Sequence, residues 1–392
     1  DKGGRVEAFR VITLTYRLDK FNEAELAQLK ELFKVYRAIT SMYYWLKRLD
    51  LDTQEALKRA KEELPYYWRN VLREDSALYL FNDVDAMPRP KKHVLKLPLI
   101  DTLHPHHGAY ISEQKLVVRL GNRARLELPI PERALKWLKE REEEVAPLKV
   151  QKTVLLQWRP EKDPNLKVQI RLKVERPKPE PDPQFLVLID LNSRYGIIAA
   201  FIVSNDDRTK VLEVNRFSPP NQRRRKEEAK KRQRAIARGR RGVNDILLRR
   251  TLRFDCSGWL KEVANKIVKK AIKYADGRPI MVRLDTPSDK ILRHTPLQGT
   301  MTSFKEVLEN LCNWYGVYLQ VCPLPSRKCP RCGSKLKELY RTRHVRVMSC
   351  DQCGLKENRD LVPLHWWLKR LGLPAARVPI LPLPPPPNGD PR

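Results

Sequence analysis

Runs of apolar residues with two different periods divide the chain into predicted strands and helices. Residues 8–18 alternate and are rich in β-branched side chains, which predicts a strand. Residues 22–49 carry apolar positions at helical spacing behind Asn22, a predicted N-cap. The pattern favours strands again from 94 to 130, then a short amphipathic helix at 132–145, and then two more strands. Strands that flank a helical stretch predict a small β-barrel carrying a helical lobe.

A proline-rich segment at residues 176–184, RPKPEPDPQ, separates two parts with different patterns. Alternating prolines favour a stiff, extended linker, so we place a domain boundary there. Beyond it come three strands, a basic helical region, a fourth strand, a helix, a fifth strand and a final short helix. This order is expected of an α/β fold of the RNase H-like type, in which the first and fourth strands are neighbours. The tail at 373–392 is polyproline-like and predicted to be disordered.

The charge of the chain indicates a polyanionic partner. The 392 residues include 78 Lys and Arg against 47 Asp and Glu, a formal net charge of +31, and 41% are hydrophobic. The hydrophobic fraction favours a folded protein of two or three domains, and the charge favours nucleic acid or an anionic membrane. The sequence contains no long apolar run, lipidation signal or signal-peptide-like segment, so nucleic acid is the preferred partner and the cytoplasm the expected location.

Positive charge is most concentrated in residues 222–241, where Lys and Arg far outnumber the two Glu. We predict that this run contacts phosphates, with a flexible, non-specific basic tail as the alternative. The residues expected to make these contacts are Arg223, Arg224, Arg225, Lys230, Lys231, Arg232, Arg234, Arg238, Arg240 and Arg241. A second group of side chains is suited to stacking on bases, although aromatic residues at helical spacing more often belong to a core. Its members are Tyr43, Tyr44, Trp45, Tyr66, Tyr67 and Trp68.

Two Cys-X-X-Cys pairs indicate a metal site. Cys329 and Cys332 form one pair and Cys350 and Cys353 the other, with a glycine directly after each. This spacing predicts a structural zinc site with four thiolate ligands, which leaves no open coordination position for zinc chemistry. Disulfides or reactive thiols are the alternative. The other three cysteines have no recognisable spacing, which suits a reducing compartment.

Three carboxylates lie at the ends of predicted elements in the second half of the chain. Asp190 closes the first strand, Asp285 closes the fourth, and Asp360 begins the last helix. An RNase H-like fold would bring the first two together and deliver Asp360 opposite them. Such a cluster suits Mg²⁺ ions and phosphodiester hydrolysis. Each acid taken singly is more often a turn or cap residue, and only their joint placement favours a catalytic site.

Residues 185–372 resemble the TnpB family, transposon-encoded RNA-guided nucleases whose RuvC-type domain is related to that of type V CRISPR effectors. The matching pieces, in order, are IDLNSRYG, LQGTMTSFKEVLENLCNWYGV, PLPSRKCPRCG leading into CDQCG, and NRDL. The resemblance implies a RuvC-like nuclease domain at 185–327 and 355–372, with a zinc ribbon at 328–354 inserted before the helix that carries Asp360. It also implies Mg²⁺-dependent cleavage of DNA paired to a guide RNA, next to a short adjacent motif.

In the first half the resemblance extends only to the pattern of elements. It implies a wedge barrel over residues 1–175 with a helical recognition insertion at about 20–90. The implied partners are a guide RNA and a target DNA, and the implied location is the cytoplasm of a prokaryote, at the nucleoid.

Two positions depart from the family pattern. Members usually have Glu where this chain has Asp285, with Asp289 as a neighbouring candidate, and Asn-Ala-Ala where residues 361–363 are Leu-Val-Pro. These departures favour the alternative of a nuclease-deficient RNA-guided DNA-binding protein, acting as a repressor or a transposition accessory factor. All three acids are present, so we favour the nuclease. A zinc-ribbon RNA-binding factor without guide or nuclease activity leaves the acids unexplained. His365, close to Asp360 in sequence, is a further candidate for positioning water or DNA.

Overall fold

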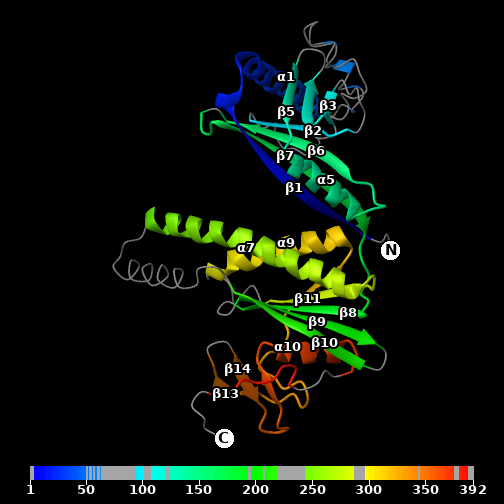
Figure 1. The fold of residues 1–392 in the computed structure, drawn as a ribbon, viewed down its shortest axis with the longest axis vertical. Helices are drawn as coiled ribbons and strands as arrows, with labels where there is room; N and C mark the ends of the chain where they lie inside the picture. The colour runs from blue at the N-terminus through cyan, green and yellow to red at the C-terminus, as the bar shows by residue number, and fades with distance from the viewer. Residues whose placement is uncertain are drawn as a thin grey trace. The chain divides into compact units, whose positions relative to one another are not determined.

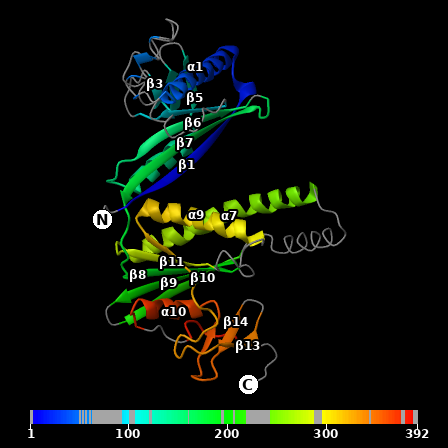
Figure 2. The same cartoon turned by 180° about the vertical axis from the view of Figure 1, so that it is seen from behind.

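The computed structural model describes two compact units of the chain (Figures 1 and 2). One unit is Glu7–Glu175, and the other is Arg176–Arg392 together with Asp1–Val6. The described residues are 4–49, 93–100, 107–120, 124–159, 161–192, 196–205, 208–218, 243–286, 296–342, 345–374 and 379–386, with a few single residues between 52 and 62. None of the helices within these ranges combines the length and the apolar character that a membrane span requires.

In the described part of the first unit there are two open sheets and two α-helices. The larger sheet has the order β1-β7-β6-β2 and the smaller one β3-β4-β5. Their bounds are β1 Arg5–Arg17, β2 Val94–Pro98, β3 His107–Ser112, β4 Lys115–Leu120, β5 Ala124–Pro129, β6 Gln151–Trp158 and β7 Asn165–Pro177, with helices α1 Glu23–Lys47 and α5 Glu132–Glu143.

The barrel expected in this unit is not closed. Closure of the larger sheet would require pairing between its edge strands, β1 and β2, and the described strands do not pair in that way. Among the described residues, a bridge between Leu99, directly after β2, and Ala109 of β3 connects the two sheets. Alternation of apolar residues shows which face of a strand is buried and carries no information about closure, which is why the sequence did not distinguish the two arrangements.

Helix α1 begins where the sequence predicted. Asn22 Oδ1 accepts a hydrogen bond from the Glu25 backbone N–H at 2.8 Å, and the Asn22 N–H donates to Glu25 Oε2 at 2.8 Å. This reciprocal pair is a capping box, which satisfies backbone donors that have no partner within the helix. The helix then buries one apolar face, formed by Leu29, Leu32, Phe33, Val35 and Tyr36.

A five-stranded sheet forms the centre of the second unit. Its order is β10-β9-β8-β11-β12, so the first strand of this unit, β8, lies beside the fourth, β11, as predicted. Strands β8, β9 and β10 are antiparallel, and β11 is parallel to both β8 and β12. The bounds are β8 Phe185–Asn192, β9 Gly196–Asn205, β10 Arg208–Phe217, β11 Ile280–Asp285 and β12 Tyr318–Val321, with helices α7 Val243–Ala275, α9 Pro296–Tyr315 and α10 Val362–Arg370.

The two faces of this sheet are covered by different helices. Helices α7 and α9 lie on one face and α10 on the other (Figure 1). Because successive side chains of a strand point to opposite faces, β8 divides its residues between the two cores. Phe185, Val187 and Ile189 pack on the side of α7 and α9, whereas Leu186 and Leu188 pack on the side of α10.

A small three-stranded antiparallel sheet lies between β12 and α10 in the sequence. Its strands are β13 Lys337–Arg341, β14 Arg346–Ser349 and β15 Lys356–Asn358, in the order β13-β14-β15. It has its own core of Leu336, Met348, Leu355 and two cysteines, and Val362 at the start of α10 joins that core. The sheet is therefore packed directly against the first turn of α10.

The disorder predicted for the C-terminal tail is wrong for residues 379–386. Ile380 packs against the core under α10, and its backbone N–H donates to Glu357 Oε2 at 3.0 Å. Tyr340 donates its hydroxyl to the carbonyl oxygen of Pro384. Proline composition indicates extended backbone, and an extended segment is ordered when it finds apolar and hydrogen-bonding partners.

Candidate carboxylate site and cysteine cluster

Asp190 and Asp285 lie side by side at one edge of the central sheet. They are register partners at the carboxyl ends of the parallel strands β8 and β11. Asp190 continues the set of alternating β8 residues that face α10, after Leu186 and Leu188. On β11, Asp285 belongs to the same face as Met281, which also packs on the side of α10. Strand register and strand alternation together bring the two carboxylates onto one face.

Asp360 reaches this face from the segment that leads into α10. The residue is 5% exposed, and its backbone N–H donates to Asn358 Oδ1 at 3.2 Å. The charge of Asp360 raises the pKa of Asp190, as does the charge of Asp285, so the three carboxylates form one electrostatic cluster. The structure brings together all three acids that the sequence singled out.

Burial and mutual repulsion disfavour ionisation at this site. Loss of solvation is the largest cause that raises the pKa of Asp190 well above its ordinary value, followed by the charges of Asp360 and Asp285. Burial also raises the pKa of Asp285 to about 6, although the Leu324 N–H donates to Asp285 Oδ1 at 2.8 Å and opposes the rise. Clustered, poorly solvated carboxylates are the environment that a bound divalent cation would stabilise.

Two arginines near the carboxylates were not singled out in the sequence. Arg359 lies near Asp190 and Asp360, and its charge lowers the pKa of Asp190. Arg283, on β11, is 3% exposed and donates to Gln320 Oε1 at 2.8 Å and to the sulfur of Cys322. An alternating strand pattern with a charged residue at a core-facing position, as at Arg283, is the signal that could have identified it.

The His365 side chain is engaged in a hydrogen bond with Glu357. Its Nε2 is bonded to Glu357 Oε2 at 2.9 Å, and both side chains are almost fully buried. The Glu357 carboxylate also accepts hydrogen bonds from the backbone N–H groups of Asn358, at 2.8 Å, and Ile380, at 3.0 Å. The suggestion that His365 positions water or DNA is therefore corrected, because the histidine takes part in a buried hydrogen-bond network beneath the Asp360 segment.

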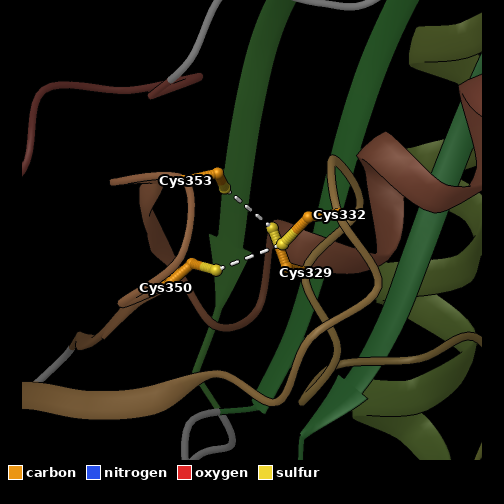
Figure 3. A group of neighbouring side chains, drawn as sticks. All are labelled: Cys329, Cys332, Cys350 and Cys353. Carbon is orange, nitrogen blue, oxygen red and sulfur yellow. Dashed lines mark hydrogen bonds between the residues drawn. The ribbon is translucent and has the colours of Figure 1, made fainter.

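The four cysteines of the two pairs form a compact cluster (Figure 3). Their sulfur atoms all lie within 4.8 Å of one another, with Cys329 to Cys353 and Cys332 to Cys350 both at 3.4 Å. A tetrahedral zinc ion with Zn–S bonds of about 2.3 Å requires sulfur atoms ~3.8 Å apart. The cluster fits such an ion, and these spacings exceed the ~2.05 Å of a disulfide bond.

Each cysteine pair is held by the same backbone turn. The Gly333 N–H donates to the Cys329 carbonyl at 2.8 Å, and the Gly354 N–H donates to the Cys350 carbonyl at 3.0 Å. Both glycines have positive φ, +80° and +67°, which glycine adopts without the steric cost of a Cβ atom. The glycine that follows each pair in the sequence therefore permits the same turn at both pairs.

The environments of the thiols differ. Hydrogen bonding to Ser334 lowers the pKa of Cys332 to about 6, whereas burial raises the pKa of Cys329 to about 12. Only the thiolate is a zinc ligand, so metal binding would have to deprotonate the buried thiol.

Hydrogen bonds connect the cysteine cluster to α10. Trp366 Nε1 donates to the Lys328 carbonyl at 2.9 Å, and Lys369 Nζ donates to the Pro330 carbonyl at 3.1 Å. The Arg359 N–H donates to the Arg346 carbonyl at 2.8 Å, which ties the residue before Asp360 to β14. The small sheet and its cysteines therefore fix the segment that carries Asp360.

The predicted phosphate contacts and one alternative acid lie outside the described residues. They are Arg223, Arg224, Arg225, Lys230, Lys231, Arg232, Arg234, Arg238, Arg240, Arg241 and Asp289.

Comparison with known proteins identifies the family of the chain. Residues 302–363, which include the four cysteines and Asp360, match the family model "Cas12f1-like, TNB domain". The chain is also 38% identical over 74 residues to "Putative transposase MJ0856.1" of Methanocaldococcus jannaschii, an alignment that covers 17% of this chain and 68% of that protein. The chain belongs to the TnpB family. This TnpB-like protein is related to the type V effectors, as the four sequence motifs indicated.

Solved structures that are similar to this TnpB-like chain include the following two. One is a Cas12f1 complex with single-guide RNA and target DNA, with a TM-score of 0.47, 11% identity, and coverage of 88% of this chain and 83% of that chain. The other is C2c1 of Alicyclobacillus acidoterrestris in complex with single-guide RNA, with a TM-score of 0.44, 8% identity, and coverage of 90% and 68%.

Proposed function

We propose that this TnpB-like protein is an RNA-guided, Mg²⁺-dependent DNA endonuclease and that Asp190, Asp285 and Asp360 are its catalytic metal ligands. The observation that supports the proposal is the meeting of three carboxylates, remote in sequence, at one sheet edge. Two of them are register partners, and the third enters from the segment before α10. A purely structural role does not explain this arrangement, because the three charges disfavour one another.

The donor set fits a hard divalent cation. Carboxylate oxygens are the ligands that Mg²⁺ prefers, and buried acids with raised pKa values gain most from its charge. Mg²⁺ bound here would supply a water of lowered pKa and a positive charge beside the leaving oxygen of a phosphodiester. The chain's own contribution is to hold the three carboxylates in place, with the Leu324 N–H orienting Asp285.

The charge of the chain and its family support DNA as the substrate and RNA as the guide. A protein with a formal charge of +31 binds polyanions through its Lys and Arg side chains. In the proposed mode, base pairing between guide and target selects the sequence, and the protein contacts the backbone and a short adjacent motif. The basic run 222–241 remains our candidate for these backbone contacts.

Zn²⁺ at the four cysteines would have a structural role. Four thiolates complete a tetrahedral site, so the ion would stabilise the small sheet and leave no position for substrate. Through Trp366, Lys369 and Arg359, that sheet fixes α10 and the Asp360 segment. This arrangement accounts for a metal loop placed directly before a catalytic residue.

The test is to purify the full chain from cells that carry its native locus and to sequence the RNA that copurifies. A plasmid matched to that RNA is then challenged with and without Mg²⁺. We expect cleavage only with Mg²⁺, abolished by Asp190→Asn or Asp360→Asn while RNA binding is retained. Glu338→Gln, which alters a surface acid on β13 that pairs with Arg341, is the control and should cut normally. Undiminished cutting by Asp190→Asn would remove these residues from catalysis.

One observation favours the nuclease-deficient alternative. Asp285 is shorter than the Glu usual at this position, and its Oδ1 is already engaged by the Leu324 N–H. A repressor or accessory factor would bind matched DNA tightly with its guide and show no Mg²⁺-dependent cleavage. The same plasmid experiment separates the two functions.

A further inference from the structure

The solvent-facing side of α1 carries a line of four cationic residues, one serine and one tryptophan. Each residue turns an α-helix by about 100°, so residues that follow one another at spacings of three or four lie on the same face. We call this line the α1 stripe, and it consists of Lys30, Lys34, Arg37, Ser41, Trp45 and Arg48, the last of these directly after the helix. The stripe extends over ~27 Å, and the opposite face of the helix is the buried one.

The C-terminal end of the stripe presents an exposed aromatic surface. Trp45 is 60% exposed, so this residue does not belong to a core, whereas Tyr66, Tyr67 and Trp68 lie outside the described residues. The Arg48 guanidinium lies over the Trp45 ring at 5.6 Å and over the Tyr44 ring at 5.4 Å. An exposed indole with a cation on its face is a surface on which a nucleobase can stack.

A hollow opens beside the middle of the stripe. Its volume is about 630 Å³, and its lining includes Lys34, Arg37, Ser41, His93, Trp158 and Glu161. Trp158, at the end of β6, forms one aromatic wall, with its ring 5.5 Å from that of Phe33 at an interplanar angle of 55°. Ligand sites of small molecules have volumes of about 300–1,000 Å³, so the hollow is large enough for a single nucleotide.

We infer that the α1 stripe and this hollow form a binding site for single-stranded RNA. One unstacked base occupies the hollow against Trp158, and a second base stacks on Trp45. The phosphates beside these bases contact Lys34 and Arg37, which line the hollow, and Arg48, which lies on the far side of Trp45 along the stripe. The inference rests on the proposed function, because it takes the guide RNA as the ligand, and it assigns that RNA a site in the first unit.

The chemistry of the site favours RNA over other polyanions. A heparin-like or acidic peptide ligand would use the cations and leave the two indole rings without a role. Duplex DNA would have to unpair and unstack a base at a free-energy cost, whereas loops and bulges of RNA present unstacked bases. The Glu161 carboxylate at the hollow can accept hydrogen bonds from the amino groups of a base but repels a phosphate. The base is therefore expected in the hollow and the phosphates on the helix.

The test is site-specific photocrosslinking to the full zinc-loaded chain, with a short single-stranded RNA containing 4-thiouridine and no added Mg²⁺. We expect crosslinked peptides that cover residues 30–48 and Trp158. Arg37→Glu and Trp45→Ala should each reduce crosslinking at this site by roughly fivefold or more. Arg37→Glu should also lower the slope of log affinity against log salt by about one phosphate contact.

Matched substitutions on α5 of the same unit are the controls. Arg133→Glu reverses an exposed charge and Trp137→Ala removes an indole, and both should leave crosslinking at the site unchanged. Trp158→Phe tests the hollow and should weaken crosslinking there. Its melting temperature, measured in parallel, shows whether the fold is intact. Crosslinks confined to other regions, equal losses in the α5 variants, or stronger crosslinking of the matching DNA oligonucleotide would overturn the inference. If these crosslinks form but the protein does not cleave DNA with Mg²⁺, the proposed nuclease function is refuted and the RNA-binding site is retained.

Discussion

Asp190 and Asp285 are register partners on adjacent parallel strands, at the edge where both strands end. The pairing places two carboxylates side by side, and the charge of Asp360 adds to the repulsion at Asp190. Folding therefore assembles a cluster of negative charge that is unfavourable unless it is protonated or neutralised by a cation.

Removing the charge of Asp190 should stabilise the metal-free protein. Its pKa is raised by burial and by two neighbouring carboxylates, so the ionised form is disfavoured in the folded state. We expect Asp190→Asn to raise the melting temperature at neutral pH without added divalent cation, by roughly 2–4 °C for each kcal/mol of repulsion relieved. Asp351→Asn, at an exposed acid paired with Lys337, should change it little. A lower melting temperature for Asp190→Asn would contradict the electrostatic account.

The contribution of Asp285 should depend on pH in a defined direction. Burial raises its pKa to about 6, so the folded state holds the proton more tightly than the unfolded state does. Its contribution to stability is therefore present at low pH and is lost as the pH rises through about 6. The melting temperature of Asp285→Asn minus that of wild type should increase between about pH 4 and about pH 7. Added Mg²⁺ should reduce this difference, and a pH-independent difference would refute the assignment.

Glu357 should be essential for the order of the Asp360 segment. Its buried carboxylate accepts hydrogen bonds from Asn358, His365 and Ile380, which belong to three different segments. Glu357→Leu leaves these donors without their acceptor and should cost roughly 2–4 kcal/mol of unfolding free energy. Hydrogen exchange should accelerate at the amides of residues 358–364.

The matched control for this change is Glu338→Leu on β13. Glu338 pairs at the surface with Arg341 and Arg346, and such pairs contribute only about 0–1 kcal/mol. Equal effects of the two substitutions would show that Glu357 is no more important than a surface acid.

Loss of one thiol should release metal and loosen α10. Cys350→Ser removes a ligand from the four-sulfur cluster, so zinc content, measured by elemental analysis, should fall from about one ion per chain. Because Trp366 and Lys369 bond to the turn that carries Cys329, exchange should also accelerate across α10. Cys312→Ala alters a buried cysteine of a different core and should retain the metal. Full zinc content in Cys350→Ser would exclude the four-thiolate site.

Gly316 should tolerate a methyl group less well than another glycine of similar conformation. Its φ is +72°, and an added Cβ would meet the Arg176 guanidinium, whose Nη2 donates to the Trp314 carbonyl at 2.7 Å. Gly277 has φ +80° with open space around it, so Gly277→Ala carries only the conformational cost of about 1 kcal/mol. In urea unfolding, Gly316→Ala should lose clearly more stability than Gly277→Ala. Equal losses would mean that Arg176 moves aside freely.

The sequence by itself determined the local and the chemical features. Asn22 with Glu25 specified the start of α1, and two Cys-X-X-Cys pairs followed by glycine specified the metal cluster, because caps, turns and ligand spacings are set by neighbours in the chain. The order of strands and helices indicated an RNase H-like sheet, and the positions of three acids at element ends indicated their convergence.

Tertiary structure alone decided how distant segments pair and which of their side chains are buried. The open sheets of the first unit, the ordering of Ile380 on Glu357 and the bonding of His365 depend on contacts between residues far apart in the chain. Trp45 is exposed although its spacing suited a core, because exposure depends on which faces of a helix have a neighbour. A hydrophobic period shows that a face is available for burial, and only packing determines whether another element covers it.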